Sequence, residues 1–220
     1  MRITRIALLG LVAVGVGCAS MGEMTAIDRA KKITKNLKKG RRIISVYAVE
    51  DNPNDVTKTH RTLKSYKRAE RLFRDAVKLD PGSSQPRIAL ANCLQLISLV
   101  HYNKYQTLED ELKKARDPSP RLQEETEHHK TEYRRYSTES NRVFLFYARN
   151  LMSHFPNPMI YESIQRNYEL LENWERAAWA ARAFLNQMNL KGASRERQQR
   201  LIHLYEERAL DSLGEAEDDT

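Results

Sequence analysis

The sequence contains little glycine, proline or cysteine. Its 220 residues include eight glycines, seven prolines and two cysteines, so glycine and proline together fall well below the roughly 12% of average proteins. This scarcity argues against turn-rich β-sandwiches and against nucleotide-binding folds that depend on glycine-rich loops. Two cysteines are too few for a disulfide-dense scaffold. Because helix-forming residues dominate the remainder, we expect an all-α protein.

Charge is abundant but unequal in sign. Lysine and arginine number 37 against 29 aspartates and glutamates, which gives a net charge of +8. The chain is polar for a globular protein, yet 40% of its residues are hydrophobic, and its length suffices to bury a core. It contains no P-loop, dinucleotide-binding fingerprint or nucleophile–base constellation. We therefore expect a protein that is not an enzyme and uses no cofactor.

The first twenty residues have the pattern of an export signal. Arg2 and Arg5 precede the uncharged run at 6–17. As a helix, these twelve residues would reach about 18 Å, short of the ~30 Å hydrocarbon core of a bilayer. The run fits the apolar region of a signal peptide better than a membrane span.

The end of this run, GVGC at residues 15–18, resembles the lipobox of bacterial lipoproteins. The resemblance implies that residues 1–17 form a lipoprotein signal peptide and that Cys18 becomes a lipidated N-terminus. Residue 19 is alanine and not aspartate. The resemblance therefore further implies that the protein is attached to the outer membrane and faces the periplasm. A plain secreted protein or an uncleaved anchor is the alternative. Cys93 then has no partner, and its apolar surroundings predict a buried, unreactive thiol.

A tether and a basic segment follow at 18–55. Residues 29–42 contain eight basic residues and no acid. They could form a solvated helix face, lie on anionic lipid headgroups within reach of the anchor, or meet an acidic protein. Nucleic acid is not an expected partner outside the cytoplasm. The apolar run at 43–49 fits helix or strand equally. The candidate membrane-facing residues are Lys31, Lys32, Lys35, Lys38, Lys39, Arg41 and Arg42.

From residue 56 onwards, the sequence predicts helices separated by proline and glycine. Ala69, Phe73 and Ala76 recur at spacings of four and three, so they share one helix face, and Pro81 marks the stop. This order resembles the second helix of a tetratricopeptide (TPR) repeat, and residues 161–184 give a second match. The resemblance implies antiparallel helical hairpins stacked as a short solenoid over 56–213, followed by an acidic disordered tail at 214–220.

The repeat pattern also predicts individual helices. After Pro81 we expect a first helix and then a partner helix that carries Leu108 and Leu112, while 121–154 forms one long helix or two. The residues expected to be buried in the first helix are Leu90, Ala91, Leu94 and Ile97. Those expected on one side of a final capping helix are Leu201, Leu204, Tyr205, Ala209 and Leu213.

A TPR-like solenoid presents a concave groove that binds an extended peptide or a partner helix. The resemblance therefore implies a membrane-anchored scaffold of the bacterial envelope that binds a partner protein there, for assembly of an envelope, secretion or pilus complex. The alternative is a helical ligand- or metal-binding lipoprotein, such as an accessory component of a transporter. The candidate groove residues are Gln85, Ile88, Asn92, Gln95, Glu162 and Arg166.

Glutamates and histidines cluster at 124–132. Glu125 and His128 have the E-x-x-H spacing of di-iron helical bundles, but such a site needs a second motif, and the sequence has none. We therefore expect no metal and a solvated helix face with i,i+4 charge pairs. The members of this face are Glu124, Glu125, Glu127, His128, His129 and Glu132.

Overall fold

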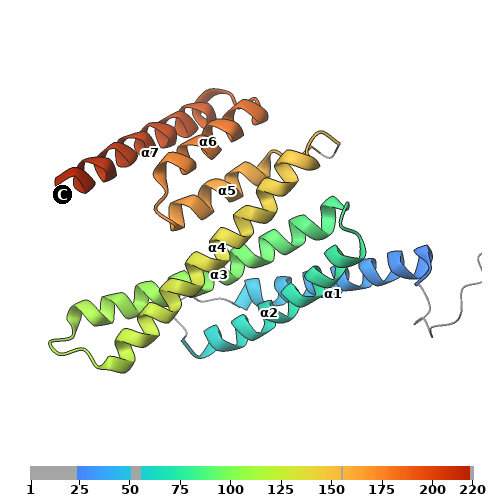
Figure 1. The fold of residues 1–220 in the computed structure, drawn as a ribbon, viewed down its shortest axis with the longest axis horizontal. Helices are drawn as coiled ribbons and strands as arrows, with labels where there is room; N and C mark the ends of the chain where they lie inside the picture. The colour runs from blue at the N-terminus through green and yellow to red at the C-terminus, as the bar shows by residue number, and fades with distance from the viewer. Residues whose placement is uncertain (1–23, 51–55, 155, 219–220) are drawn as a thin grey trace, which may run out of the picture.

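The computed structural model of the protein describes residues 24–50, 56–154 and 156–218 (Figure 1). These residues form seven helices and no strand, so the all-α prediction is confirmed. Cys18 and the signal sequence lie outside the described residues. The helices are α1 (Ala26–Glu50), α2 (Val56–Leu79), α3 (Ser84–Lys114), α4 (Pro120–Asn150), α5 (Met159–Leu170), α6 (Trp174–Met188) and α7 (Gly192–Asp218).

Each helix packs against the next one in the chain, from α1 on α2 to α6 on α7. In addition, α1 contacts α3, and α3 contacts α5. Figure 1 shows α1 and α2 together at one end and α5, α6 and α7 together at the other. The two longest helices, α3 and α4, have 31 residues each and connect these ends.

Local sequence signals explain where the helices begin and end. Ser119 caps α4 by accepting a hydrogen bond from the backbone N–H of Leu122, and Pro120 occupies the first turn. Asn173 caps α6 by accepting from the backbone N–H of Arg176. At the other end of α6, Asn189 has a φ of 46°, the left-handed conformation in which many helices stop.

Two clusters of buried side chains form the core. One joins α1 to α4 around Tyr66, Phe73 and Leu94. The other joins α3 to α7 around Phe144 and Ile164. The predicted small–aromatic–small face of α2 is fully buried, as are the residues expected inside the first part of α3. Small residues at these positions allow neighbouring helices to approach closely.

The structure corrects the predicted partner helix. Leu108 and Leu112 belong to α3, which continues unbroken to Lys114 because no proline or glycine interrupts residues 87–114. The partner of α3 is α4, and the open question about 121–154 is settled as one long helix through Asn150.

The two ends of the helical region also differ from expectation. Residues 43–49 are helical, and α1 packs on α2, so the packed helices begin before residue 56. At the other end, α7 reaches Asp218, so residues 214–218 of the expected disordered tail are helical. Alanine and glutamate in this stretch are good helix formers.

The predicted buried side of α7 was partly wrong. Ile202 and Tyr205 are buried, whereas Leu204 is 39% exposed. Ile202 precedes Tyr205 by three positions and therefore shares its face, while Leu204 lies about 100° away from Tyr205. The side chain of Leu213 lies outside the described residues.

A close helix–helix approach lies at Gly40 in α1. A Cβ atom there would stand 2.4 Å from Cε1 and 2.6 Å from Cζ of Phe73, a fully buried ring. We expect Gly40→Ala to lower the free energy of unfolding by up to about 2 kcal/mol. Overpacking of about 1–3 kcal/mol outweighs the better helix propensity of alanine, about 1 kcal/mol. Chemical denaturation measures this difference.

The matched control is Gly82→Ala in the α2–α3 turn. The nearest atom to its added Cβ is Asp80 Oδ1 at 3.7 Å, an ordinary contact. Equal stability of the two variants and the unaltered protein would contradict the close approach of α1 and α2.

Candidate binding surfaces

A groove lies between α1 and α3. Its volume is about 240 Å³, and the fully buried ring of Phe73 contributes to its lining. The remaining lining residues are Arg41, Ile44 and Ser45 of α1, and Ile88, Ala89, Asn92 and Leu96 of α3. The groove thus combines an aliphatic surface with an exposed guanidinium and an exposed amide, a mixture suited to an amphipathic peptide segment.

The structure places two of the six predicted groove residues in this groove, namely Ile88 and Asn92. Gln85 is exposed in the first turn of α3, outside the lining. Gln95 turns toward α5, where its side-chain amide donates to the backbone oxygen of Ser163 (3.0 Å) and to Asn167 Oδ1 (3.1 Å). Gln95 therefore joins two helices.

The remaining two predicted groove residues lie on α5. Arg166 donates to Glu162, one turn earlier on the same helix. Neither residue lines the groove between α1 and α3. The six predicted residues therefore do not form one continuous lining.

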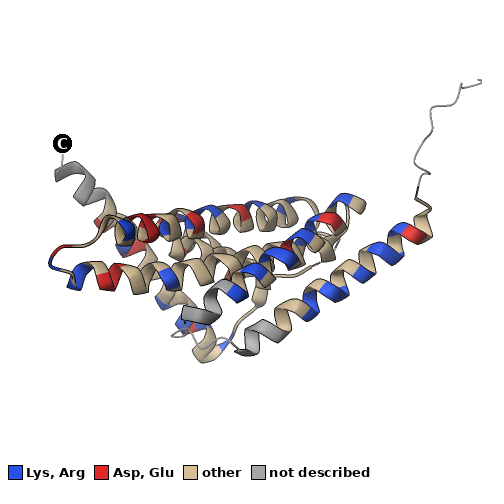
Figure 2. Cartoon of the chain, turned by 90° about the horizontal axis from the view of Figure 1, so that it is seen from below, with Lys and Arg blue, Asp and Glu red and all other residues tan. Residues whose placement is uncertain are grey.

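The predicted basic residues form a stripe along α1. All seven are exposed, and none of them forms an ion pair with another described residue. Figure 2 shows lysine and arginine repeating along this helix, and Asp28 lies in its first turn. The stripe faces away from Leu37 and Gly40, which are buried against the core.

None of the described helices is both long enough and apolar enough to cross a bilayer.

Two histidines meet inside the α3–α4 interface. His101 Nδ1 and His129 Nδ1 are 2.9 Å apart, and both residues are buried. Tyr136 stacks on the His101 ring at a centroid distance of 5.9 Å. One Nδ1 must carry a proton and the other must not, so a neutral pair satisfies the hydrogen bond. His101 Nε2 is buried without a hydrogen-bond partner among the described residues.

Burial favours the neutral form of both rings. Desolvation lowers the pKa of His101 to about 3, with a further decrease from His129. Desolvation likewise lowers the pKa of His129 to about 4, and the neighbouring His128 adds to this effect. Protonation of this pair would therefore oppose the packing of α3 on α4.

The histidine pair corrects the expected solvated face of α4. His128 is exposed as predicted, but His129 points into the core. Its spacing from the buried Thr126, Tyr133 and Tyr136 places it on the apolar side of the helix, a signal present in the sequence. The burial of His101 was not predicted, although this residue continues the buried face of Leu94, Ile97 and Ser98 on α3. Within the described residues, no group of three metal-ligating side chains is arranged to hold an ion.

Cys93 is fully buried, which confirms its predicted environment. Its thiol lies 3.4 Å from the backbone oxygen of Tyr66, to which it donates a weak hydrogen bond. Burial raises the pKa of the Cys93 thiol to about 12, so the reactive thiolate is scarce at neutral pH.

The histidine pair predicts acid sensitivity. An unfolded histidine has a pKa near 6.5, so the unfolded chain takes up protons before the folded chain does. The stabilisation is complete above about pH 6.5 and is lost as the pH falls toward the folded pKa values. We expect the free energy of unfolding to fall between pH 7 and pH 5, by on the order of 1–2 kcal/mol for each histidine. Urea titrations at several pH values measure this slope.

The test variant is the double substitution His101→Phe with His129→Leu, which replaces both rings by apolar side chains. It should flatten the pH dependence in this interval. The control, His203→Gln, removes an exposed histidine of α7 and should retain the slope. A double variant as acid-sensitive as the unaltered protein would show that other groups cause the effect.

Comparison of the chain with protein-family models, curated proteins and solved structures found no match. The resemblances based on the N-terminal motif and on helical spacing therefore stay predictions.

Proposed function

We propose that the protein is a non-enzymatic scaffold of the bacterial envelope, anchored to the outer membrane through a lipid on Cys18 and facing the periplasm. In this proposal, the helices stack as TPR-like hairpins and bind a partner protein of an envelope, secretion or pilus complex. The order of helix contacts supports the stacking, because α1, α3 and α5, the first helices of successive pairs, contact one another in turn.

The observation that carries the proposal is the groove between α1 and α3. Ile88 and Leu96 offer half-buried aliphatic surface, and Asn92 and Arg41 offer polar atoms beside it. A partner segment can bury apolar side chains against Ile88 and Leu96 and form hydrogen bonds with Asn92 and Arg41. Such a mixture suits an amphipathic helix or an extended strand of a partner protein.

The basic stripe of α1 supports attachment to a membrane surface. Ala26, where α1 begins, follows Cys18 by eight positions, which can span at most roughly 29 Å. A lipid on Cys18 would therefore hold the stripe near the headgroups, where each basic residue contributes about 1 kcal/mol toward an anionic surface. Arg41 belongs to both surfaces, but the other six residues of the stripe lie outside the groove, so both surfaces can be occupied together.

The groove is tested with Asn92→Arg. Asn92 is exposed, so the substitution leaves the core intact, but it adds a long charged side chain to the groove. We expect this variant to recover a specific envelope partner at least about tenfold less efficiently than the unaltered protein. Affinity purification from gently solubilised membranes, followed by quantitative mass spectrometry, measures the recovery.

Asn186→Arg, the same change at an exposed position of α6, is the control and should retain the partner. If no envelope protein is enriched with the unaltered chain, the scaffold proposal fails. If both variants lose the partner equally, the binding surface lies elsewhere.

The stripe is tested by replacing Lys31, Lys35 and Lys38 together with glutamine. Loss of about 1 kcal/mol for each lysine predicts roughly 100-fold weaker binding to vesicles that contain phosphatidylglycerol. Added salt should also weaken binding of the unaltered protein to these vesicles, since ions screen surface charges. Vesicle co-sedimentation of the Cys18→Ser protein, which lacks the lipid attachment atom, isolates the electrostatic contribution.

The control replaces three exposed lysines outside α1, namely Lys78, Lys114 and Lys191, with glutamine. It removes the same charge but should retain most of the binding. Equal losses in both triple variants would indicate that net charge alone attracts the vesicles. In cells, continued acyl labelling of Cys18→Ser would contradict the lipoprotein assignment.

A further inference from the structure

A second, larger hollow lies between α4, α5 and α6, and it shares no lining residue with the groove between α1 and α3. Its volume is about 560 Å³, within the range of pockets that hold small organic ligands. We refer to it as the α4–α6 cleft. The side chains that carry the argument are Asn141, Arg142, Phe146, Arg149, Leu171 and Arg176.

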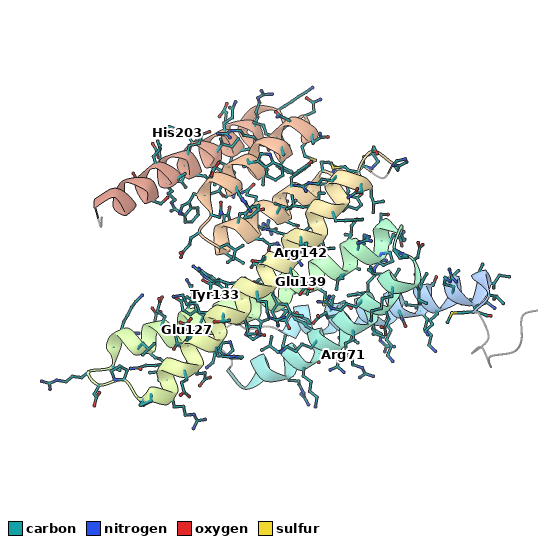
Figure 3. The ribbon with its side chains drawn as sticks, viewed as in Figure 1. Arg71, Glu127, Tyr133, Glu139, Arg142 and His203 are labelled. Carbon is teal, nitrogen blue, oxygen red and sulfur yellow. The ribbon has the colours of Figure 1, made fainter. Side chains whose placement is uncertain are left out.

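The charge of the α4–α6 cleft has one sign. Arg142, Arg149 and Arg176 belong to its lining, and no aspartate or glutamate does. None of the three forms an ion pair with another described residue, although Arg134, Arg135 and Arg166 nearby in the sequence each pair with a glutamate. Figure 3 labels Arg142 on α4, in the part of that helix that faces α5. The lining therefore offers guanidinium groups without a protein anion.

A buried amide in the same lining lacks a hydrogen-bond partner. Asn141 is only 3% exposed, and its Nδ2 donates to no atom among the described residues. An unpartnered buried donor costs free energy of folding, so such groups in native proteins call for a physical reason. An acceptor atom on a bound molecule would satisfy this N–H group.

The orientation of this amide is fixed by a chain of hydrogen bonds. Gln95 donates to Asn167 Oδ1 (3.1 Å), and Asn167 Nδ2 in turn donates to Asn141 Oδ1 (2.9 Å) and to Ser140 Oγ (3.0 Å). Rotating the Asn141 amide by 180° would bring two N–H groups together. The network thus holds the oxygen of Asn141 inward and leaves its N–H group as the free donor.

Helix α6 begins at the cleft, and its first turn also carries Glu175, which lines the neighbouring hollow. Its N-cap, Asn173, and its first-turn residue Arg176 both belong to the lining. The N-terminal end of a helix carries partial positive charge, which favours an anion at this position.

Part of the lining is apolar, and a second hollow adjoins the cleft. Leu145, Phe146 and Leu171 line the cleft, and Phe146 is held in place by Arg87, whose guanidinium lies 3.9 Å above its ring. A neighbouring hollow of about 340 Å³ shares Leu145, Arg149, Tyr168 and Arg176 with the cleft and extends to Trp179 and Glu175. An elongated ligand with an apolar body fits this arrangement.

We propose that the α4–α6 cleft binds a small organic anion, consisting of a carboxylate or phosphate group on an apolar body. The anionic group receives hydrogen bonds from Asn141 Nδ2 and from Arg142, Arg149 and Arg176, while the apolar body lies against Phe146 and Leu171. This site is separate from the groove of the proposed scaffold function and does not depend on it. The protein would then respond to a solute in addition to binding a partner.

Isothermal titration calorimetry of the purified full-length protein tests the site with three probes of similar size. Phenyl phosphate and phenylacetate carry the two candidate anionic groups, and benzyl alcohol is the neutral counterpart. We expect one-to-one binding of at least one anion and at least about tenfold weaker binding of benzyl alcohol. The anion that binds more tightly identifies the preferred group. Absence of binding by both anions, or equal affinity for benzyl alcohol, overturns the proposal.

Variants locate the bound anion. Arg142→Gln and Arg149→Gln alter exposed side chains, so they should fold normally and weaken binding of the preferred anion at least about fivefold each. Asn141→Asp replaces the free donor by an acceptor and should abolish binding. The control is Arg71→Gln, an exposed arginine of α2 outside the cleft, labelled in Figure 3, and it should bind as the unaltered protein does.

The two arginine variants decide the outcome even if Asn141→Asp does not fold. Unchanged affinity in both of them, or an equal loss in Arg71→Gln, shows that the anion binds elsewhere on the basic surface and overturns the assignment.

Discussion

The close packing of α3 on α4 is the interaction on which the rest of the structure depends. Ser98 Oγ donates to the backbone oxygen of Tyr133 at 2.8 Å and lies 2.6 Å from Ser137 Oγ, and Ser140 Oγ donates to the backbone oxygen of Ala91 at 2.9 Å. Side chains of one helix can reach the backbone of the other only where the helices approach closely. Both core clusters include residues of these two helices. Without this pair, neither end of the molecule would have a helix face to pack against.

The same interface also buries many polar side chains. The serine contacts, the neutral histidine pair and the amide network around Asn167 all lie between α3 and its neighbours. Buried polar groups stabilise a fold only when their partners are in place, because each unpaired group loses its hydration without compensation. Such networks tolerate fewer alternative arrangements than an aliphatic core does. They therefore fix the relative position of α3, α4 and α5 more sharply than apolar packing alone.

The sequence predicted the fold class and several buried faces, and the reasons are local. Ala69, Phe73 and Ala76 follow a helical period, and Pro81 marks the stop, so neighbouring residues carry those signals. The pairing of α3 with α4 was not predicted, because the TPR pattern implies helices shorter than α3. The true length of α3 follows from the absence of proline and glycine over about thirty residues. His101 meets His129, and Arg176 of α6 meets Arg142 and Arg149 of α4, only through tertiary packing. No spacing within one helix could reveal that Gln95 of α3 would orient Asn141 of α4 through Asn167 of α5.

Helix α3 connects the two proposed binding surfaces. Asn92 belongs to the groove shared with α1, and three residues later Gln95 begins the hydrogen-bond chain that ends at the α4–α6 cleft. Both residues belong to one unbroken helix, so no hinge separates the surfaces they serve. An anion in the cleft would satisfy the last donor of that chain and so favour the present arrangement of α3, α4 and α5. The groove also uses α3. A partner that binds only this arrangement of the helices would therefore bind more readily once the anion has stabilised it.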